Sequence, residues 1–390
     1  MHVPHRQRPA HRRRGARPPR VRADAAVRKR LKHPFFDRGR RDSIEGNFTP
    51  EELGLALNNV SLPPEALRYD VTPLGLHYTL SHFDIPALRP SHRLTVDGTV
   101  ERPRAFQVQE LRALGERTVR VTMECAGNGR AGMAPRYPSM PWTHGAVGTA
   151  DWTGTPLSKL LAVVKPRGAA VEIAFHGADH GFDSGVEHPF ARSLRLQEAN
   201  DDVIVAWAMN GQPLLPQHGA PLRLVVPGWF GMASVKWLER IELREQPFDG
   251  YQQVTGYRYK KKPGEDGVPV RHMKVKSLMQ PPGIPDWYTR RRLVEQGTVP
   301  VEGRAWSGGG VAVTRVELAV DGDWRDAELD PPSRPFAWQR WRAEWDARPG
   351  EHELACRATD ARGDVQPLEP DWNMGGMGNN AVQRMRVTVR

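Results

Sequence analysis

The chain has 390 residues, of which 39% are hydrophobic, and this length is enough for two domains with full cores. It contains no run of about 18 apolar residues, so we expect no membrane-spanning helix. The formal net charge is +11, but residues 1–41 carry 15 Lys and Arg against two Asp, which leaves residues 42–390 at a net charge of −2. The basic character therefore belongs to the N-terminal tail.

The tail, residues 1–41, has few large apolar side chains and many charges, which predicts a disordered segment. Its arginines are followed by the polar residues 15–20, whereas an export signal requires an apolar stretch there. We therefore expect a cytoplasmic protein. No aromatic residues alternate with the arginines to stack on bases, so weak attraction to acidic surfaces is favoured over specific nucleic-acid binding.

Short β-like runs and short helical segments alternate over residues 42–280. Strands are expected at residues 93–98, 119–123, 170–175, 203–209, 222–226 and 235–243, and helices at 109–114 and 156–164. The dipeptide Asn210-Gly211 is a strong signal for a hairpin turn. This alternation predicts an α+β domain with a mixed sheet.

Beyond a Pro-rich connection at residues 263–300, the pattern becomes all-β. Strands are expected at residues 315–320, 336–345, 351–359 and 382–389, with a turn at Asp321-Gly322. About seven short strands within roughly 90 residues are typical of an immunoglobulin-like (Ig-like) sandwich. We place the boundary between the two domains at residues 280 and 281.

Cys125 lies in a sequence context that predicts a metal-binding thiolate. It follows a β-branched, apolar strand and precedes the permissive turn Gly127-Asn128-Gly129, which ends at Arg130. A thiolate at the end of a rigid strand, beside an arginine, suits a soft metal that binds an anion. The alternative is a buried structural cysteine. That structural role is expected for the second cysteine, Cys356, which lies in a predicted strand.

The stretch around Cys125 closely resembles the cysteine loop of the sulfite oxidase family of molybdenum enzymes. Matching blocks extend the resemblance over residues 74–389, and they are 145–148, 151–157, 206–214, 218–223, 226–228, 235–238, 305–310 and 372–376. The resemblance implies a molybdenum–molybdopterin cofactor with Cys125 as metal ligand, and an Ig-like domain that forms a homodimer. No Cys-x-x-Cys-His motif for haem is present, so we expect no haem, and electrons would pass to a separate acceptor protein or to oxygen.

The resemblance also implies residues that hold the cofactor, whose phosphate needs cations and whose ring edges need hydrogen-bond partners. These residues are His82, Asp179, His218, Arg223, Ser234 and Lys236. Arg130 and Trp142 match positions that line the family's oxyanion pocket. Arg223 and Lys236 lie in apolar strands, where an unpaired charge is costly, which favours contact with a ligand. Structural roles remain the alternative for the two histidines, Asp179 and Trp142.

Three positions depart from the sulfite-binding pattern. Leu80 and Gln339 stand where arginines are expected, although Arg340 is a possible substitute, and Ser184 stands where a tyrosine is expected. Each charge-assisted hydrogen bond to a bound anion is worth about 1.5–3 kcal/mol, so the losses should weaken sulfite binding.

Three hypotheses for function follow. The leading one is a molybdenum oxidoreductase that transfers an oxygen atom, most simply from water to sulfite. The second is a molybdenum-dependent reductase of sulfoxides or another oxo-substrate, which a less cationic pocket would suit. The third is an interaction protein without turnover.

Overall fold

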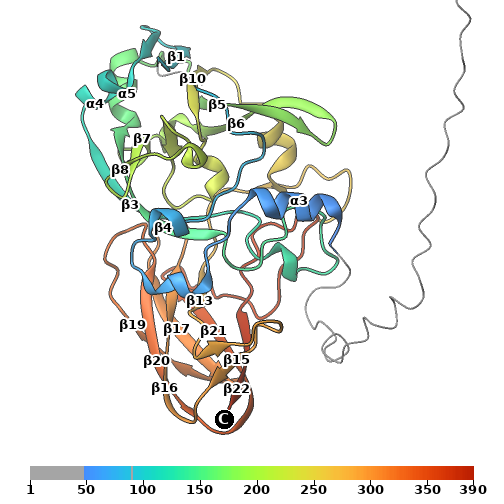
Figure 1. Ribbon diagram of the computed structural model, residues 1–390. Coiled ribbons are helices and arrows are strands. Elements are labelled where there is room, and N and C mark those ends of the chain that lie inside the picture. The colour runs from blue at the N-terminus through green and yellow to red at the C-terminus, as the bar shows by residue number, and fades with distance from the viewer. Residues whose placement is uncertain (1–47, 89–90) are drawn as a thin grey trace, which may run out of the picture. The chain divides into compact units, whose positions relative to one another are not determined.

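The computed structural model describes residues 48–88 and 91–390, which lie within one compact unit, Ile44–Arg390. The prediction of a disordered tail at residues 1–41 lies outside the described residues. Among these residues no helix is long and apolar enough to cross a membrane. Strands dominate and helices are few (Figure 1).

The first described element is helix α3 (Pro50–Asn58), which begins with a capping box between Thr49 and Glu52 and has Pro50 in its first turn. Two short 3₁₀ turns follow, η1 (Pro64–Arg68) and η2 (Leu74–Leu76). This N-terminal segment reaches the C-terminal sheets, because Arg304 donates a 2.7 Å hydrogen bond from Nε to the carbonyl of Leu67.

One sheet of the N-terminal region is mixed, as predicted. Its strands lie in the order β2 (Arg104–Phe106), β1 (Leu94–Gly98), β10 (Leu238–Arg244), β5 (Glu172–Asp183) and β6 (Val186–Arg195). β1 runs parallel to β10, and the other pairs are antiparallel. Two short helices, α4 (Val108–Ala113) and α5 (Leu157–Val164), occupy the ranges where the sequence predicts helices.

The other sheet of this region is antiparallel. Its strands are β3 (Arg117–Glu124), β4 (Val147–Pro156), β7 (Ile204–Met209) and β8 (Gln212–Pro213), and β9 (Arg223–Val225) pairs with β7. Asn210 and Gly211 both have positive φ, at 51° and 74°, and they join β7 to β8 in the predicted hairpin. The strand expected at residues 235–243 begins only at Leu238, because the φ of Trp237 is 48° and breaks the extended backbone.

Short elements connect these sheets. They are η3 (Arg130–Gly132), η4 (Leu196–Glu198), η5 (Pro216–His218), η6 (Gly231–Ala233), the π-helical turn η7 (Gln252–Gly256), β11 (Arg258–Tyr259) and β12 (Val268–Pro269).

The C-terminal region, from β13 to β22, is all-β, as predicted. One sheet has the order β13 (Lys276–Met279), β16 (Gly297–Trp306), β20 (Gln339–Ala347) and β19 (Glu328–Leu329). The other has the order β14 (Ile284–Pro285), β15 (Arg292–Val294), β22 (Gln383–Val389), β21 (Gly350–Asp360), β17 (Val313–Val320) and β18 (Asp323–Asp326). Figure 1 shows these strands gathered together in orange and red.

The C-terminal region has a hydrophobic cluster of its own, while the cluster of the N-terminal region also takes in Leu278, Trp306, Trp338 and Met377. In the C-terminal region Trp341, Trp345, Leu318 and Leu354 are buried within one cluster between the sheets, and Cys356 is fully buried there, which fits its expected structural role. Because β13 pairs with β16, this region's sheet includes residues that precede position 281, so the exact domain boundary stays a prediction.

Candidate functional site

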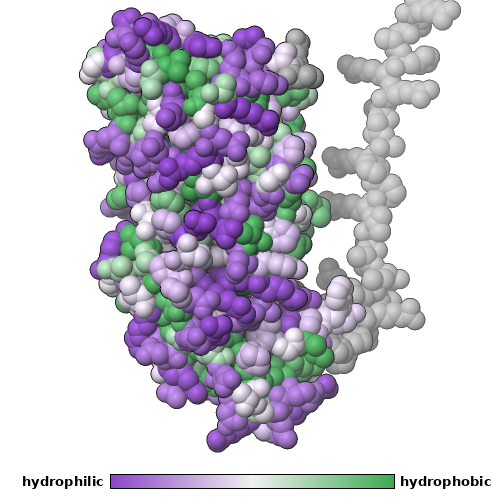
Figure 2. All heavy atoms as spheres, turned by 90° about the vertical axis from the view of Figure 1, so that its left-hand side faces the viewer, coloured by the Kyte–Doolittle hydropathy of each residue, from purple (hydrophilic) through white to green (hydrophobic). Residues whose placement is uncertain are grey.

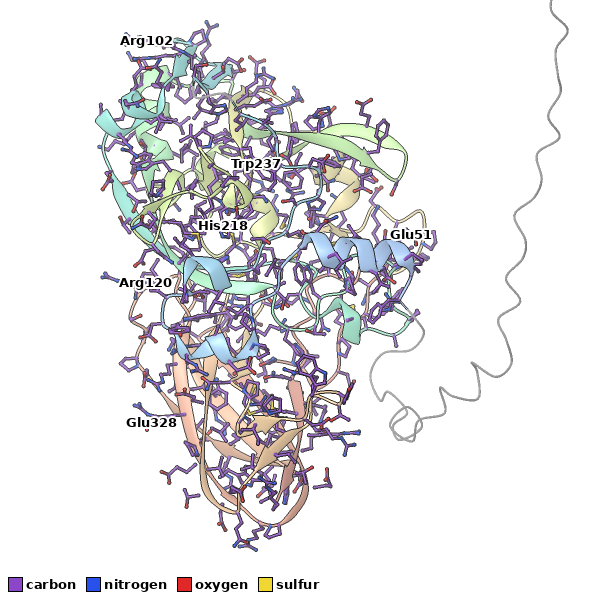
Figure 3. The ribbon with its side chains drawn as sticks, viewed as in Figure 1. Glu51, Arg102, Arg120, His218, Trp237 and Glu328 are labelled. Atoms are coloured by element: carbon purple, nitrogen blue, oxygen red, sulfur yellow. The ribbon has the colours of Figure 1, made fainter. Side chains whose placement is uncertain are left out.

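A cavity lies in the N-terminal region, and both apolar and polar side chains line it. The structure brings seven of the predicted site residues to its wall: His82, Cys125, Asp179, His218, Arg223, Ser234 and Lys236. They come from β5, η5, β9, the end of β3 and two loops. Figure 3 labels one of them, His218, in the interior of the N-terminal region.

Cys125 is the first residue after β3, and the antiparallel pairing of β3 with β4 fixes its position. Its amide donates to the carbonyl of Ala146 at 2.9 Å, and its Sγ accepts a hydrogen bond from the amide of Gly127 at 3.4 Å. Burial raises the pKa of the Cys125 thiol, while the positive charge of Arg130 and the Gly127 hydrogen bond oppose that rise. A cation or metal beside the sulfur therefore favours the thiolate over the thiol.

Arg223 is buried at the start of β9. Its Nη1 donates to the carbonyl of His218 at 3.0 Å and its Nη2 to the carbonyl of Ser234 at 3.1 Å, while its guanidinium lies 4.5 Å from the ring centre of Trp152. Burial lowers the pKa of Arg223 to about 10, which leaves it charged near neutral pH. Neutral partners hold this charge, and no carboxylate pairs with it among the described residues.

Lys236 lies in the segment before β10. Its Nζ donates to the carbonyls of Leu80 and Gln217 at 2.9 and 3.0 Å and to Ser81 Oγ at 2.9 Å. Burial and the charge of Arg223 lower the pKa of Lys236 to about 7, against the opposing effect of Asp179. Burial raises the pKa of Asp179 to about 6, and its Oδ1 has no hydrogen-bond partner among the described residues.

Two histidines of the cavity are neutral near pH 7. Burial lowers the pKa of His82 to about 4 and that of His218 to about 3. His82 Nε2 is hydrogen-bonded to Tyr257 Oη at 3.0 Å, and the His82 ring lies 5.0 Å from that of Phe190. His218 Nε2 is buried without a hydrogen-bond partner in the described part of the chain, so it is available to a ligand.

Ser234 contributes less to the cavity than its position suggests. Its Oγ accepts a 3.1 Å hydrogen bond from the amide of Val226, and its carbonyl accepts one from Arg223. These bonds fix the loop between β9 and β10, so the observed role of Ser234 is to hold Arg223 in place.

Arg130 and Trp142 do not line the cavity. The Nε of Arg130 donates to the carbonyl of Gly375 at 3.0 Å and its Nη1 to that of Met140 at 3.2 Å. Trp142 packs in the same apolar cluster as Cys125. Both residues are buried next to the cysteine loop, and their predicted contact with substrate stays a prediction.

The three departures from the sulfite pattern lie in different places. Leu80 lines the cavity, but Ser184 is exposed at the tip of the β5–β6 hairpin. Gln339 is buried in the C-terminal region, where it bonds the amide and carbonyl of Val313. Arg340 is paired with Glu302 and supplies no substitute charge to the cavity.

Among the residues of the cavity wall that sequence reasoning missed are His77, Tyr78 and Tyr257. The rings of His77 and His218 meet edge to face with centres 5.5 Å apart. Tyr257 follows η7, 175 residues after its partner His82. No periodicity marks these positions, because irregular turns bring them to the cavity.

Comparison with known proteins places this geometry in a family. Residues 82–252 match the model described as the oxidoreductase molybdopterin binding domain, and residues 269–390 match the Mo-co oxidoreductase dimerisation domain. The chain is 33% identical to sulfite oxidase of Gallus gallus, over 86% of this chain and 78% of that protein. The chain belongs to the sulfite oxidase family.

Further relatives agree with this assignment. Mitochondrial sulfite oxidase of Mus musculus is 34% identical over 85% of this chain, and the chain spans only 64% of that protein's length. The crystal structure of the sulfane dehydrogenase SoxCD from Paracoccus pantotrophus matches with a TM-score of 0.72 and 26% identity, over 89% of this chain and 93% of that one. The predicted family is confirmed, and the model that matches its N-terminal region is described as a molybdopterin-binding oxidoreductase domain.

Proposed function

We propose that this member of the sulfite oxidase family catalyses oxygen-atom transfer, with sulfite oxidation to sulfate as the leading reaction. One observation carries the proposal: the Sγ of Cys125 shares a buried cavity with two cations, Arg223 and Lys236, that have no carboxylate bonded to them in the described structure. A site that must bind a soft metal and an anionic group together requires this combination.

The residues present fit a molybdopterin. Cys125 would ligate the metal, and Arg223 and Lys236 would bind the phosphate. The unpartnered His218 Nε2 and Asp179 Oδ1, together with His82, would meet the polar edges of the ring system. Buried polar atoms without partners are rare in folded proteins, so two of them in one cavity support a polar ligand.

Bound there, the cofactor supplies two-electron oxygen-atom chemistry, which oxidises sulfite with an oxygen from water and releases two protons and two electrons. The protein's own part is electrostatic and steric. The pair formed by His82 and Tyr257 is uncharged near pH 7, because burial lowers the pKa of the imidazole and raises that of the phenol. This pair shares one proton in its hydrogen bond at the cavity wall. There it would orient an oxygen atom of a bound substrate.

A second candidate is reduction of a neutral oxo-substrate such as a sulfoxide. Leu80 presents an apolar wall where sulfite binding favours an arginine. The guanidinium of Arg130 already donates to two backbone carbonyls. The apolar wall lacks one positive charge for a dianion, and the bonded guanidinium offers it fewer free N–H donors, which together favour a substrate without charge.

The assembly is part of the same proposal. The match of residues 269–390 to a dimerisation domain supports a homodimer built through an Ig-like sandwich, with the domain boundary near residue 280. On the face shown in Figure 2, hydrophobic residues form small patches between hydrophilic ones, so that face is not a continuous apolar interface. Sedimentation at micromolar protein should give twice the 43.8 kDa chain mass. A cytoplasmic location and a separate electron acceptor complete the proposal.

Steady-state assays on molybdenum-loaded protein decide between the two reactions. Sulfite oxidation predicts sulfite-dependent reduction of an artificial one-electron acceptor, and sulfoxide reduction predicts oxidation of a reduced dye by an alkyl sulfoxide. Leu80→Arg should lower the KM for sulfite by about tenfold, since one charge-assisted hydrogen bond is gained. Loaded protein that turns over neither substrate would contradict both assignments.

A further inference from the structure

The glutamate beside the metal-ligand cysteine is anchored by the C-terminal region. Glu124, the last residue of β3, is 2% exposed, and its Oε1 accepts a 2.9 Å hydrogen bond from Lys276 Nζ in β13. Its Oε2 accepts one from Trp306 Nε1 in β16 at 3.0 Å. Lys276 is itself only 1% exposed, so this ion pair is shielded from water.

The Glu124 carboxylate also bonds to the cysteine loop, residues 125–132. Asn128 Nδ2 donates to Glu124 Oε1 at 2.9 Å, and Asn128 Oδ1 accepts from the amide of Ala146 at 3.1 Å. The turn that follows Cys125 is therefore bonded to the carboxylate of Glu124, whose negative charge Lys276 of the C-terminal region balances.

A second set of contacts comes from residues 373–380 of the C-terminal region. The amide of Gly378 donates to the carbonyl of Ala126 at 2.7 Å, and Asn379 Nδ2 donates to that of Gly129 at 2.8 Å. Lys276 joins the two sets, because its Nζ also donates to the carbonyl of Asn379 at 2.7 Å. At Gly376 an added Cβ would lie 2.5 Å from Arg130 Cγ, so this segment packs directly on the loop.

From these contacts we infer that Lys276 is a positioning residue: with Glu124 and residues 373–380 it forms a clamp that holds the cysteine loop in its metal-binding conformation. The inference rests on the proposed role of Cys125. It makes the C-terminal region part of the site, in addition to any role in dimerisation. The region would act through the loop backbone, without touching substrate.

The test uses full-length protein produced with molybdenum and three variants. Lys276→Met leaves Glu124 buried without its cation, and Trp306→Phe removes one hydrogen bond while keeping an aromatic ring. In the double variant Glu124→Gln/Lys276→Met, the charge and its partner are removed together. The matched control is Arg357→Met, which breaks the pair with buried Glu317 in the C-terminal region, far along the chain from the loop.

Amide hydrogen exchange and molybdenum content are measured on folded, purified chains. Lys276→Met should speed exchange in residues 125–132 by about tenfold, because local opening there becomes easier, while β17 and β21 stay unchanged. Molybdenum per chain should fall by a similar factor. The double variant should recover most of the slow exchange and most of the molybdenum content. Trp306→Phe should change exchange and molybdenum content in the same direction as Lys276→Met, but by less.

Two outcomes would overturn the clamp. One is unchanged exchange in the loop of both Lys276→Met and Trp306→Phe. The other is an equal loss of protection in β17, β21 and the loop, with molybdenum per folded chain unchanged, which is the signature of a purely structural pair. Wild-type protein that takes up no molybdenum would count against the proposed function alone, because the exchange measurement still decides the clamp.

Discussion

The half-buried Lys236 carries an ammonium group whose hydrogen bonds are accepted by three neutral oxygens. Its pKa falls from 10.5 to about 7 on folding. Between those values the unfolded chain holds a proton that the folded chain has lost, so folding stability from this group rises with pH from about 7 to 10.5. Below pH 7 Lys236 is charged in both the folded and the unfolded chain, so the full free-energy cost of burying the charge opposes folding. A bound anion would offset that cost.

Anion binding to protein without molybdenum should therefore weaken as pH rises above 7. We expect the affinity for sulfate, whose own charge is constant in this range, to fall by up to about tenfold per pH unit as Lys236 loses its proton. Calorimetric titration from pH 7 to 9 measures this trend. Lys236→Met should bind weakly at every pH, and a wild-type profile as flat as that of the variant would show that Lys236 does not bind the anion.

The sequence indicated which single residues face the cavity where a polar side chain conflicts with its apolar neighbours along the chain. Arg223 is a charge in an apolar strand, Lys236 is a charge in the apolar segment before one, and Cys125 is a thiol before a glycine-rich turn, so each signals a ligand. His77 and Tyr257 carry no such conflict, because a histidine and a tyrosine fit many loops. Only the folded chain shows that they face the same cavity.

At the scale of elements, local patterns gave most strands and the Asn210-Gly211 hairpin, because alternation and turn chemistry are encoded within a few residues. The parallel pairing of β1 with β10 could not be found in this way, since Thr95 pairs with Arg240 across more than half of the N-terminal region. The same holds for β13, whose place in the C-terminal sheet depends on its partner β16.

Close packing between strands leads to a second prediction. At Gly303 in β16 an added Cβ would overlap the carbonyl of Leu278 and lie 2.6 Å from the ring of Trp341. Gly303→Ala should therefore lower the free energy of unfolding by about 1–3 kcal/mol, as overpacked core substitutions do. Chemical denaturation measures this loss.

The control is Gly54→Ala in helix α3, where no atom lies within 4 Å of an added Cβ. That change should stabilise by about 0.5–1 kcal/mol, because alanine favours the helix. Equal effects of the two substitutions would show that β13 and β16 are not packed as described.

At the scale of the molecule, the two regions are joined by a hydrophobic cluster that contains residues of both, among them Phe175 and Trp306. The cavity lies among the N-terminal sheets, while Lys276 and Trp306 are bonded to Glu124, just before the cysteine loop. Asn379 is bonded to the loop itself, at Gly129. Sequence resemblance predicted both regions, but it could not show that the second one reaches the cysteine loop. Those contacts span 152 to 250 residues of chain and leave no local pattern.

The central claim is that Cys125 ligates molybdenum in this cavity. X-ray absorption at the molybdenum edge tests it most directly, on wild-type protein and on Cys125→Ala that has been confirmed to be folded. We expect the metal in the wild type to have one sulfur neighbour more than in the variant. The variant should also lose turnover. Identical sulfur coordination in the two proteins would contradict the claim.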